Sequence, residues 1–429
     1  MKSRNRKKRL YTFIGTMAIV AISLILVVPL FDKKQIVENS VAGHAPVIRQ
    51  APNPYMIRLT EAYEKEIRKL MKRSRTPGAA IAIVRDSTIV YMKGFGYKAS
   101  NSDDSVDVNT VFRIASVSKC FASFLTGVMV EDGVLDWEDP VVKYLPDFKL
   151  ISPEQTEKLN ISHVLSHTTG LPYHTYTNLV EEGTELPELL GMLKGVRLSN
   201  EVGKEYSYQN VAYSLIGEVI RSANHKTYEA TMQEKVFGPL NMENASIDYA
   251  SLMSNSNIAR PHQRARRQWV PTRINDTYYN VAPAGGINAS IRDMANFMVA
   301  LLGHRSDVIS KTTLEHLFTP AIIARSKNRN YRKYQRPKQS YYGLGWRILH
   351  FPSDTIVYHG GYVTGYRSEV GLDPRDEIAV CILANAPGEL ADNGVPLFFD
   401  LFNNYREQII AWEKQQRVPP DPLVEGHAY

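Results

Sequence analysis

The alternation of hydrophobic and polar positions predicts helices and strands in separate parts of the chain. Residues 56 to 73 carry apolar side chains at helical spacing and predict an amphipathic helix. Residues 78 to 84 and 88 to 92 have the composition of two short strands joined by a turn. Residues 116 to 130 are largely apolar and end before an Asp-Gly pair, which predicts a buried helix.

The second half of the chain changes period. Between about residue 135 and residue 325 helical patterns and loops dominate, and beyond that point the pattern repeats every two residues. Strands are predicted at residues 342 to 349, 355 to 358, 366 to 371 and 377 to 383, and an amphipathic helix at 395 to 412. Because strands occur at both ends of the domain, we expect an α+β fold with one antiparallel β-sheet, flanking helices and a mostly helical inserted region.

The N-terminal segment combines positive charge with an apolar run. Eight basic residues and one acidic residue fall within residues 1 to 34, which accounts for the whole formal charge of +7. Residues 10 to 31 are long enough to cross a bilayer. We expect an uncleaved single-pass signal-anchor, with the following domain on the periplasmic or extracellular face and no nucleic-acid partner. Cleavage near Ala42 or Ala45 would instead release the domain to the same side.

The predicted organisation has four parts. Residues 1 to 34 form the basic tip and membrane anchor, 35 to 53 a linker, 54 to 415 the folded domain, and 416 to 429 a tail. Inside the domain, residues 325 to 338 hold seven basic residues and no acidic one. This stretch is either a solvated loop or a contact with an anionic envelope polymer or lipid headgroups.

The two cysteines, Cys120 and Cys381, both fall in apolar stretches. Two buried thiols are the interpretation we favour, since free cysteine behaves as a small apolar residue. A disulfide between them is the alternative in an exported protein.

Ser116 and Lys119 are three residues apart at the start of the predicted helix of residues 116 to 130. Residues three apart share a helix face, so the amine can lie beside the hydroxyl. A serine hydroxyl needs a nearby base to become a nucleophile, and burial lowers the pKa of a lysine until its amine can serve as that base. The spacing therefore makes Ser116 a candidate nucleophile of a serine hydrolase, and a helix-capping serine followed by a surface lysine is the alternative interpretation.

A second acid/base group must pass the proton to the leaving atom, and a tyrosine with an amide two residues on can do this. Three such triplets occur, at Tyr176, Tyr208 and Tyr278. Tyr208 is preferred because a rigid apolar-faced helix, predicted for residues 211 to 220, follows it directly. Asn210 is the amide of this triplet.

His359, Gly360 and Gly361 follow the strand predicted to end at residue 358. Glycines at a strand end let a ligand approach the backbone closely, so their N–H groups can pair with an extended substrate or an oxyanion. A turn histidine with no role in chemistry is the alternative interpretation of His359.

The chain resembles the serine β-lactamase and penicillin-binding-protein superfamily over about residues 54 to 412. Within it, the class C-related branch is the more similar part, which includes D-Ala-D-Ala carboxypeptidases, D-aminopeptidases and esterases. The resemblance rests on nine short pieces in the family's order: residues 77–80, 112–119, 133–141, 165–172, 208–210, 237–242, 283–286, 342–346 and 359–361.

The resemblance implies a role for each matching position. Ser116 would be acylated, with Lys119 as its proton partner and Tyr208 as the second acid/base. Asn210 would contact a substrate amide and His359 would help to balance charge. The backbone N–H groups of Ser116 and Tyr362 would form the oxyanion hole. The substrate would be a small peptide, an ester or a β-lactam, and no cofactor or metal is implied.

The chain departs from the class C β-lactamases at the third motif. Those enzymes carry Lys-Thr-Gly where this chain has His359-Gly360-Gly361, which is more similar to the peptidase and esterase members. Efficient β-lactam turnover is therefore not expected, although acylation is.

Two rival functions are open on the sequence. His163 and His167 have the spacing of a zinc pair on a helix, but the glutamate of a zinc hydrolase motif is missing. The second rival is a receptor that binds penicillin or peptidoglycan, without catalysis or with acylation only. The presence of Ser116, Lys119, Tyr208 and His359 together argues against it.

Overall fold

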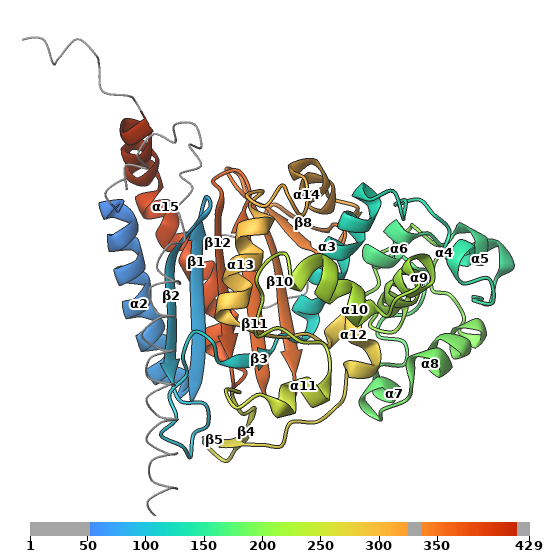
Figure 1. Ribbon diagram of the computed structural model, residues 1–429, viewed down its shortest axis with the longest axis horizontal. Coiled ribbons are helices and arrows are strands. Elements are labelled where there is room, and N and C mark those ends of the chain that lie inside the picture. Colours follow the sequence, from blue (N-terminus) through green and yellow to red (C-terminus); the bar gives the residue numbers. More distant parts are fainter. Residues whose placement is uncertain (1–51, 325–336, 418–429) are drawn as a thin grey trace, which may run out of the picture. The chain divides into compact units, whose positions relative to one another are not determined.

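Strands from both ends of the domain meet in one eight-stranded sheet. The computed structural model describes residues 52–324 and 337–417. Its sheet has the strand order β2-β1-β12-β11-β10-β9-β8-β7, with every pairing antiparallel (Figure 1). The strands are β1 (Gly78–Arg85), β2 (Thr88–Gly96), β7 (Ile322–Ile323), β8 (Gln339–Tyr342), β9 (Arg347–His350), β10 (Thr355–Val363), β11 (Tyr366–Asp373) and β12 (Ile378–Ala384). The predicted α+β architecture is confirmed.

One strand prediction is wrong. Residues 342 to 349 form two strands, β8 and β9, instead of one, because Gly343 and Gly345 turn the chain between them. Gly345 has a φ of 80°, and a Cβ built on it would lie 2.6 Å from Ser123 Cβ. A glycine-only turn packed this tightly against the neighbouring helix cannot continue as a strand.

Both faces of the sheet are buried. Along β12, successive side chains alternate between these two faces. Val380 and Ile382 pack with the terminal helices α2 (Pro54–Ser74) and α15 (Glu389–Arg417). Cys381 and Leu383 point into the larger core on the opposite face. Successive strand side chains point to opposite faces, so this alternation explains a strand that is apolar at every position.

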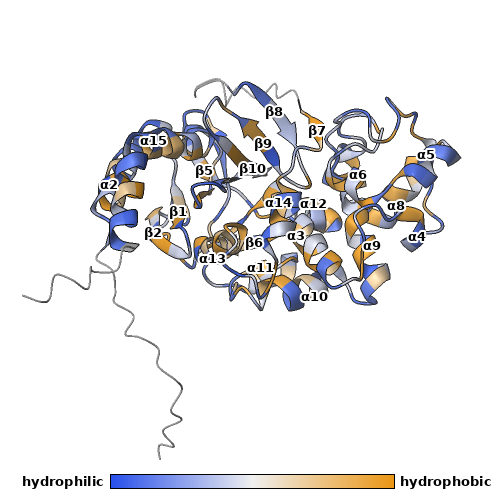
Figure 2. Ribbon diagram, turned by 90° about the horizontal axis from the view of Figure 1, so that it is seen from above, coloured by the Kyte–Doolittle hydropathy of each residue, from blue (hydrophilic) through white to orange (hydrophobic). Residues whose placement is uncertain are grey.

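The two terminal helices lie side by side on one face of the sheet (Figure 1). Helix α2 begins after Asn53, whose side-chain oxygen accepts from the backbone N–H groups of Tyr55 and Met56. The Asn53 amide also donates to the carbonyl of Ile409 in α15, 3.2 Å away. Hydrophilic and hydrophobic residues both occur along α2 and α15 (Figure 2), as expected for helices with one face on the sheet.

The middle of the chain supplies the helical region on the other face. Two small antiparallel sheets lie within it, β3 (Val111–Arg113) with β6 (Asn288–Ser290) and β4 (His262–Ala265) with β5 (Gln268–Pro271). Its helices are α3 (Ser118–Glu131), α4 (Val141–Tyr144), α5 (Pro153–Lys158), α6 (Ile161–Leu165), α7 (Thr177–Glu181), α8 (Leu186–Met192), α9 (Leu215–Asn224), α10 (Tyr228–Met232), α11 (Tyr249–Ser254), α12 (Ala282–Gly285), α13 (Ile291–Leu301) and α14 (Lys311–Leu317). Short single-turn segments cover Ala115–Val117, Leu193–Gly195, Gln233–Phe237, Ala212–Ser214 and Tyr279–Val281.

Helix α3 is the centre of this region, because nearly all of its side chains are buried. A single helical turn, Ala115–Val117, connects it to β3. The helix predicted to start at Ser116 therefore starts two residues later, with Ser116 in the preceding turn. Ala115 has a φ of 48°, a left-handed conformation that is strained for alanine and common beside functional groups.

Several sequence predictions concern residues outside the described ranges. These are the membrane anchor and linker of residues 1 to 51, almost all of the basic stretch at 325 to 338, and the tail from residue 418. None of the helices within residues 52–324 and 337–417 is both long enough and apolar enough to cross a membrane.

Candidate active site

Ser116 and Lys119 lie side by side. Lys119 Nζ is 3.5 Å from Ser116 Oγ. Ser116 is partly exposed, whereas Lys119 has no exposed surface. The short turn before α3 therefore gives the geometry that a continuous helix was predicted to give.

Two acceptors hold the Lys119 amine. Nζ lies 2.9 Å from Asn210 Oδ1 and 2.8 Å from the carbonyl oxygen of Ala284. Burial lowers the pKa of Lys119 well below its usual value, and the positive charge of Arg347 lowers it further. A neutral amine has two hydrogens and one lone pair, so the two acceptors use both hydrogens and leave the lone pair for the Ser116 hydroxyl.

The structure brings one of the three tyrosine triplets to this amine. Lys119 Nζ lies 4.6 Å from the centre of the Tyr208 ring, and Asn210 of the same triplet bonds it directly. Burial raises the pKa of Tyr208, while a hydrogen bond with Ser116 acts in the opposite direction. Tyr208 is therefore a protonated phenol beside the hydroxyl at neutral pH.

The other two triplets have structural partners elsewhere. The Tyr176 hydroxyl bonds the carbonyl of Met192, and the Tyr278 hydroxyl donates to Glu181. The Asn280 amide donates to the carbonyls of Val180 and Thr184. Neither triplet contacts Ser116 or Lys119 by any of these bonds.

Strand β10 passes directly beside Ser116. His359, Gly360 and Gly361 lie inside this strand, which continues to Val363, so the prediction that they follow the strand end is wrong. The strand continues because these residues pair with Val370, Glu369 and Ser368 of β11. A Cβ built on Gly361 would collide with Ile114 O and Ser368 Oγ and lie 3.0 Å from Ser116 N. Only glycine allows this close approach.

Tyr362 follows on the same strand, with an exposed side chain. Its neighbour Gly361 places β10 against the backbone nitrogen of Ser116. This contact places the two predicted oxyanion-hole residues, Ser116 and Tyr362, on backbone segments that lie against each other.

His359 is a buried neutral imidazole. Its Nδ1 is 2.9 Å from the carbonyl of Gly360, which can only accept, so Nδ1 carries the proton. Nε2 is 3.1 Å from the Tyr342 hydroxyl and accepts from it. Burial, followed by the charge of Arg347, lowers the pKa of His359 well below its usual value.

Arg347 is a site residue that the sequence analysis missed. It lies on β9, with its guanidinium carbon 5.5 Å from the ring centre of Tyr208 and 5.7 Å from that of Tyr342. Tyrosines act most strongly on its charge, which also acts on the buried carboxyl of Glu369, and among the described residues no carboxylate forms an ion pair with it. The residue directly follows the Gly-Leu-Gly-Trp piece, and recognising the turn inside that piece would have put it at the start of a new strand.

The histidine pair does not form a zinc site. Helix α6 ends at Leu165, so His163 and His167 are not on one helix face. His163 Nδ1 accepts from the backbone of Asn160, and His167 adopts a φ of 59°. His167 instead packs its buried ring 4.4 Å from the centre of the Tyr208 ring and accepts from the Gln209 backbone, which supports the triplet from behind.

Both cysteines are buried and free, as favoured from the sequence. Burial raises the pKa of the Cys120 thiol well above its usual value, so Cys120 is not a nucleophile at neutral pH. Within residues 52–324 and 337–417, the one group of three side chains able to hold a metal ion is Asp86, His304 and Glu377. None of these residues contributes to the arrangement around Ser116.

Comparison with known protein families shows which family the chain belongs to. The family model for Beta-lactamase matches residues 64–398. The chain belongs to the beta-lactamase family. It is therefore a member of the superfamily of serine hydrolases that also includes the penicillin-binding proteins.

Individual relatives of this beta-lactamase-family chain are distant. Protein flp of Staphylococcus aureus (strain N315) is 22% identical over 340 residues, or 77% of this chain and 65% of the relative. An unguisins hydrolase of Aspergillus campestris is 24% identical over 356 residues, or 80% of this chain and 65% of the relative. The chain thus spans about two thirds of the length of these curated relatives.

A solved structure shows the same fold. It is the octameric penicillin-binding protein homologue from Pyrococcus abyssi, with a TM-score of 0.70 and 23% identity. The match covers 82% of this chain and 81% of that one. At this identity the likeness concerns the fold alone.

The contact between β10 and Ser116 predicts different outcomes for two adjacent glycines. Gly361→Ala should lower the free energy of unfolding by about 1–3 kcal/mol and abolish acylation, because its Cβ meets rigid backbone at Ile114. Gly360→Ala is the matched control, since its Cβ meets only the ends of the Glu369 and Arg367 side chains. Urea unfolding and acylation by an activated-serine probe measure both effects. Equal behaviour of the two variants would contradict the assigned contact.

The charge of Arg347 predicts a shift in pH dependence. Acylation needs neutral Lys119, so its rate should rise with pH through the lysine pKa and reach a plateau well below the usual lysine range. Arg347→Gln removes a repelling charge, so it should move this rise to higher pH. The control Arg221→Gln changes an exposed arginine paired with Glu218. An unmoved profile in Arg347→Gln would show that Arg347 does not tune the amine.

Proposed function

We propose that this domain is a serine hydrolase of the cell envelope that acts through an ester on Ser116. The observation that carries the proposal is the hydrogen bonding of Lys119. Both hydrogens of its neutral amine are taken by Asn210 and Ala284, so its lone pair is left for the Ser116 hydroxyl. The substrate is an amide or ester, and the peptidase and esterase members of the family are the closest in chemistry.

The first step is attack by Ser116. Lys119 accepts the hydroxyl proton as Oγ bonds to the substrate carbonyl carbon, and the carbonyl oxygen becomes an oxyanion. The backbone N–H groups of Ser116 and Tyr362 are the proposed donors to this oxyanion. The close packing of Gly361 against Ser116 supports this assignment, because preorganised donors stabilise the developing charge most effectively.

The second step is expulsion of the leaving group. Tyr208 hydrogen-bonds Ser116 and has a raised pKa, so it holds a proton that it can deliver to the leaving atom. Lys119, protonated in the first step, lies 4.6 Å from the centre of the Tyr208 ring and is the proposed donor that restores this proton. Water then attacks the Ser116 ester by the reverse sequence and releases the acid.

The charge of Arg347 favours one type of substrate. This half-buried cation forms no ion pair in the described part of the chain, although its charge acts on the buried Glu369 carboxyl, and it lies over the face of Tyr208. A cation that forms no ion pair attracts anions and repels cations. We therefore infer a substrate with a carboxylate close to the scissile bond, as in a carboxypeptidase, instead of the protonated amine that an aminopeptidase recognises.

We also propose that the enzyme is held at the membrane by residues 10 to 31, with the domain outside the cytoplasm. The support comes from the sequence. The basic residues that give this chain its excess positive charge lie immediately before and after that apolar run. An anionic envelope polymer or lipid headgroup as a partner of residues 325 to 338 is part of the same proposal.

The acyl-enzyme is tested by labelling. The protein is treated with a fluorescent penicillin and, separately, with an activated-serine phosphonate, and adducts are mapped by mass spectrometry. We expect label on Ser116, and its loss in Ser116→Ala. Ser118→Ala is the matched control, since that hydroxyl accepts from the Ile287 backbone and should remain unlabelled without affecting Ser116. Absence of any adduct would favour a receptor that binds without acylation.

The substrate charge is tested with two short esters that have the same acyl group and differ only in a carboxylate or a carboxamide on the carbon that bears the leaving oxygen. The wild type should prefer the carboxylate in kcat/KM, and Arg347→Gln should reduce that preference about tenfold to a hundredfold, the value of a charge-assisted hydrogen bond. A change in the basicity of Lys119 would affect both esters equally, so it would leave the ratio of their kcat/KM values unchanged. An unchanged ratio would refute the role of Arg347 while leaving the acyl-enzyme intact.

A further inference from the structure

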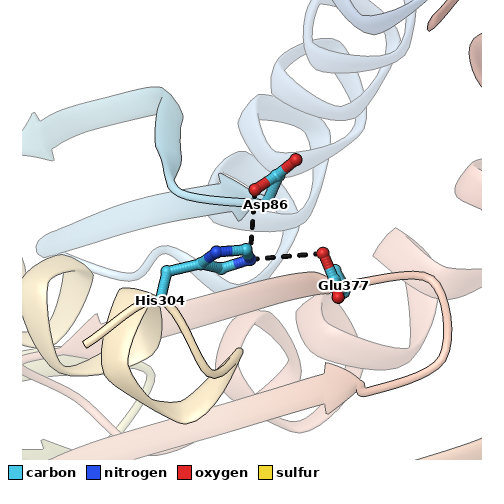
Figure 3. A group of neighbouring side chains, drawn as sticks. All are labelled: Asp86, His304 and Glu377. Carbon is cyan, nitrogen blue, oxygen red and sulfur yellow. Dashed lines mark hydrogen bonds and ion pairs between the residues drawn. The ribbon is translucent and has the colours of Figure 1, made fainter. Parts of the chain in front are cut away.

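A second group of reactive side chains lies away from Ser116. His304 Nε2 is 3.1 Å from Asp86 Oδ1 and 3.2 Å from Glu377 Oε2 (Figure 3). All three atoms lie within 4.8 Å of one another. The side chains are one quarter to two fifths exposed, so an ion from solvent can reach them.

Three separate elements supply these side chains. Asp86 is in the turn between β1 and β2, Glu377 directly precedes β12, and His304 follows α13. The Asp86 backbone N–H donates to the carbonyl of Glu377 at 2.7 Å, which fixes the two turns to each other. The Ser87 N–H donates to Asp86 Oδ1 at 2.7 Å and so orients that carboxylate.

The spacing of the three atoms suits a small divalent cation. Zinc binds imidazole nitrogen at about 2.0–2.1 Å and carboxylate oxygen at about 2.0–2.2 Å, so neighbouring ligand atoms of a tetrahedral site lie about 3.4 Å apart. The two distances from His304 Nε2 are close to this value. One nitrogen and two carboxylate oxygens also match the donors that zinc accepts, and water would complete the site.

Direct contact without a metal is the alternative arrangement, since the two distances from His304 Nε2 also suit hydrogen bonds to the carboxylates. Lys311 lies 3.6 Å from Glu377 and approaches Oε1, the oxygen that does not face His304. Lys311 therefore leaves the Oε2 side of Glu377 open to an ion, and the titration below distinguishes the two arrangements.

We propose that Asp86, His304 and Glu377 bind one divalent cation, with zinc as the best fit. The site joins the end of α13 to two turns of the sheet. It lies beside the Arg85–Ile378 pair at one end of β1 and β12. Ser116 lies against Gly361, which is connected across the sheet to Ser368, Leu383 and Ala80 near the opposite end. The cation is therefore structural and takes no part in the reaction at Ser116.

The test uses the full chain, purified without a polyhistidine tag and stripped with a chelator. Isothermal titration with zinc chloride should show one ion bound per chain, and thermal unfolding should show a Tm that rises with zinc concentration. His304→Gln keeps an N–H donor for both carboxylates but loses the metal ligand, so it should weaken binding at least about tenfold and remove the Tm increase. Glu377→Gln should do the same.

His225→Asn is the matched control, because His225 is exposed and distant in sequence from the three ligands. It should bind zinc as the wild type does. Two results would overturn the proposal: no zinc binding by the wild type, or binding and a Tm increase that persist unchanged in both His304→Gln and Glu377→Gln. Neither result bears on acylation of Ser116.

Discussion

The enclosure of one amine, that of Lys119, is the interaction on which the site depends. Burial lowers the pKa of Lys119 well below its usual value, because the ammonium form loses its hydration. The face of Tyr208 lies 4.6 Å away and favours the ammonium form, but by only about 1–2 kcal/mol. Arg347 adds repulsion on the side of burial. Burial and this repulsion both favour the neutral amine, which can accept the proton of Ser116.

Contacts from other parts of the fold hold Lys119 in this buried position. The Tyr213 hydroxyl holds the Lys119 carbonyl at 2.8 Å, and the glycine turn at Gly345 packs onto the same part of α3. That turn also creates the β8–β9 hairpin, which carries Arg347 to the face of Tyr208. Lysine burial, the hairpin and the position of Arg347 are thus parts of one packing arrangement. A change in any of them should alter the basicity of Lys119.

The sequence predicted the parts of the site that depend on short spacing. Ser116 and Lys119 were found because three residues along a turn or helix give the same neighbourhood. A strand was likewise predicted at residues 377 to 383, where β12 is found. Tyr208 was preferred over two similar triplets from the helix after it, and only the fold shows that it reaches Lys119 while Tyr176 and Tyr278 have other partners.

What the sequence could not predict depends on contacts between distant segments. Arg347 is separated from Lys119 by more than two hundred residues, and its pattern of neighbours resembles an ordinary strand until Gly343 and Gly345 are recognised as a turn. Asp86, His304 and Glu377 come from three turns with no shared motif. Local spacing carries no information about such long-range contacts.

The charge state of Lys119 tests the account most directly. Nitrogen NMR of the ¹⁵N-labelled lysine side chains measures it, with the Lys119 signal assigned by its loss in Lys119→Arg. The account predicts an uncharged amine at pH 7, and an ammonium signal that persists to the usual lysine range would contradict it.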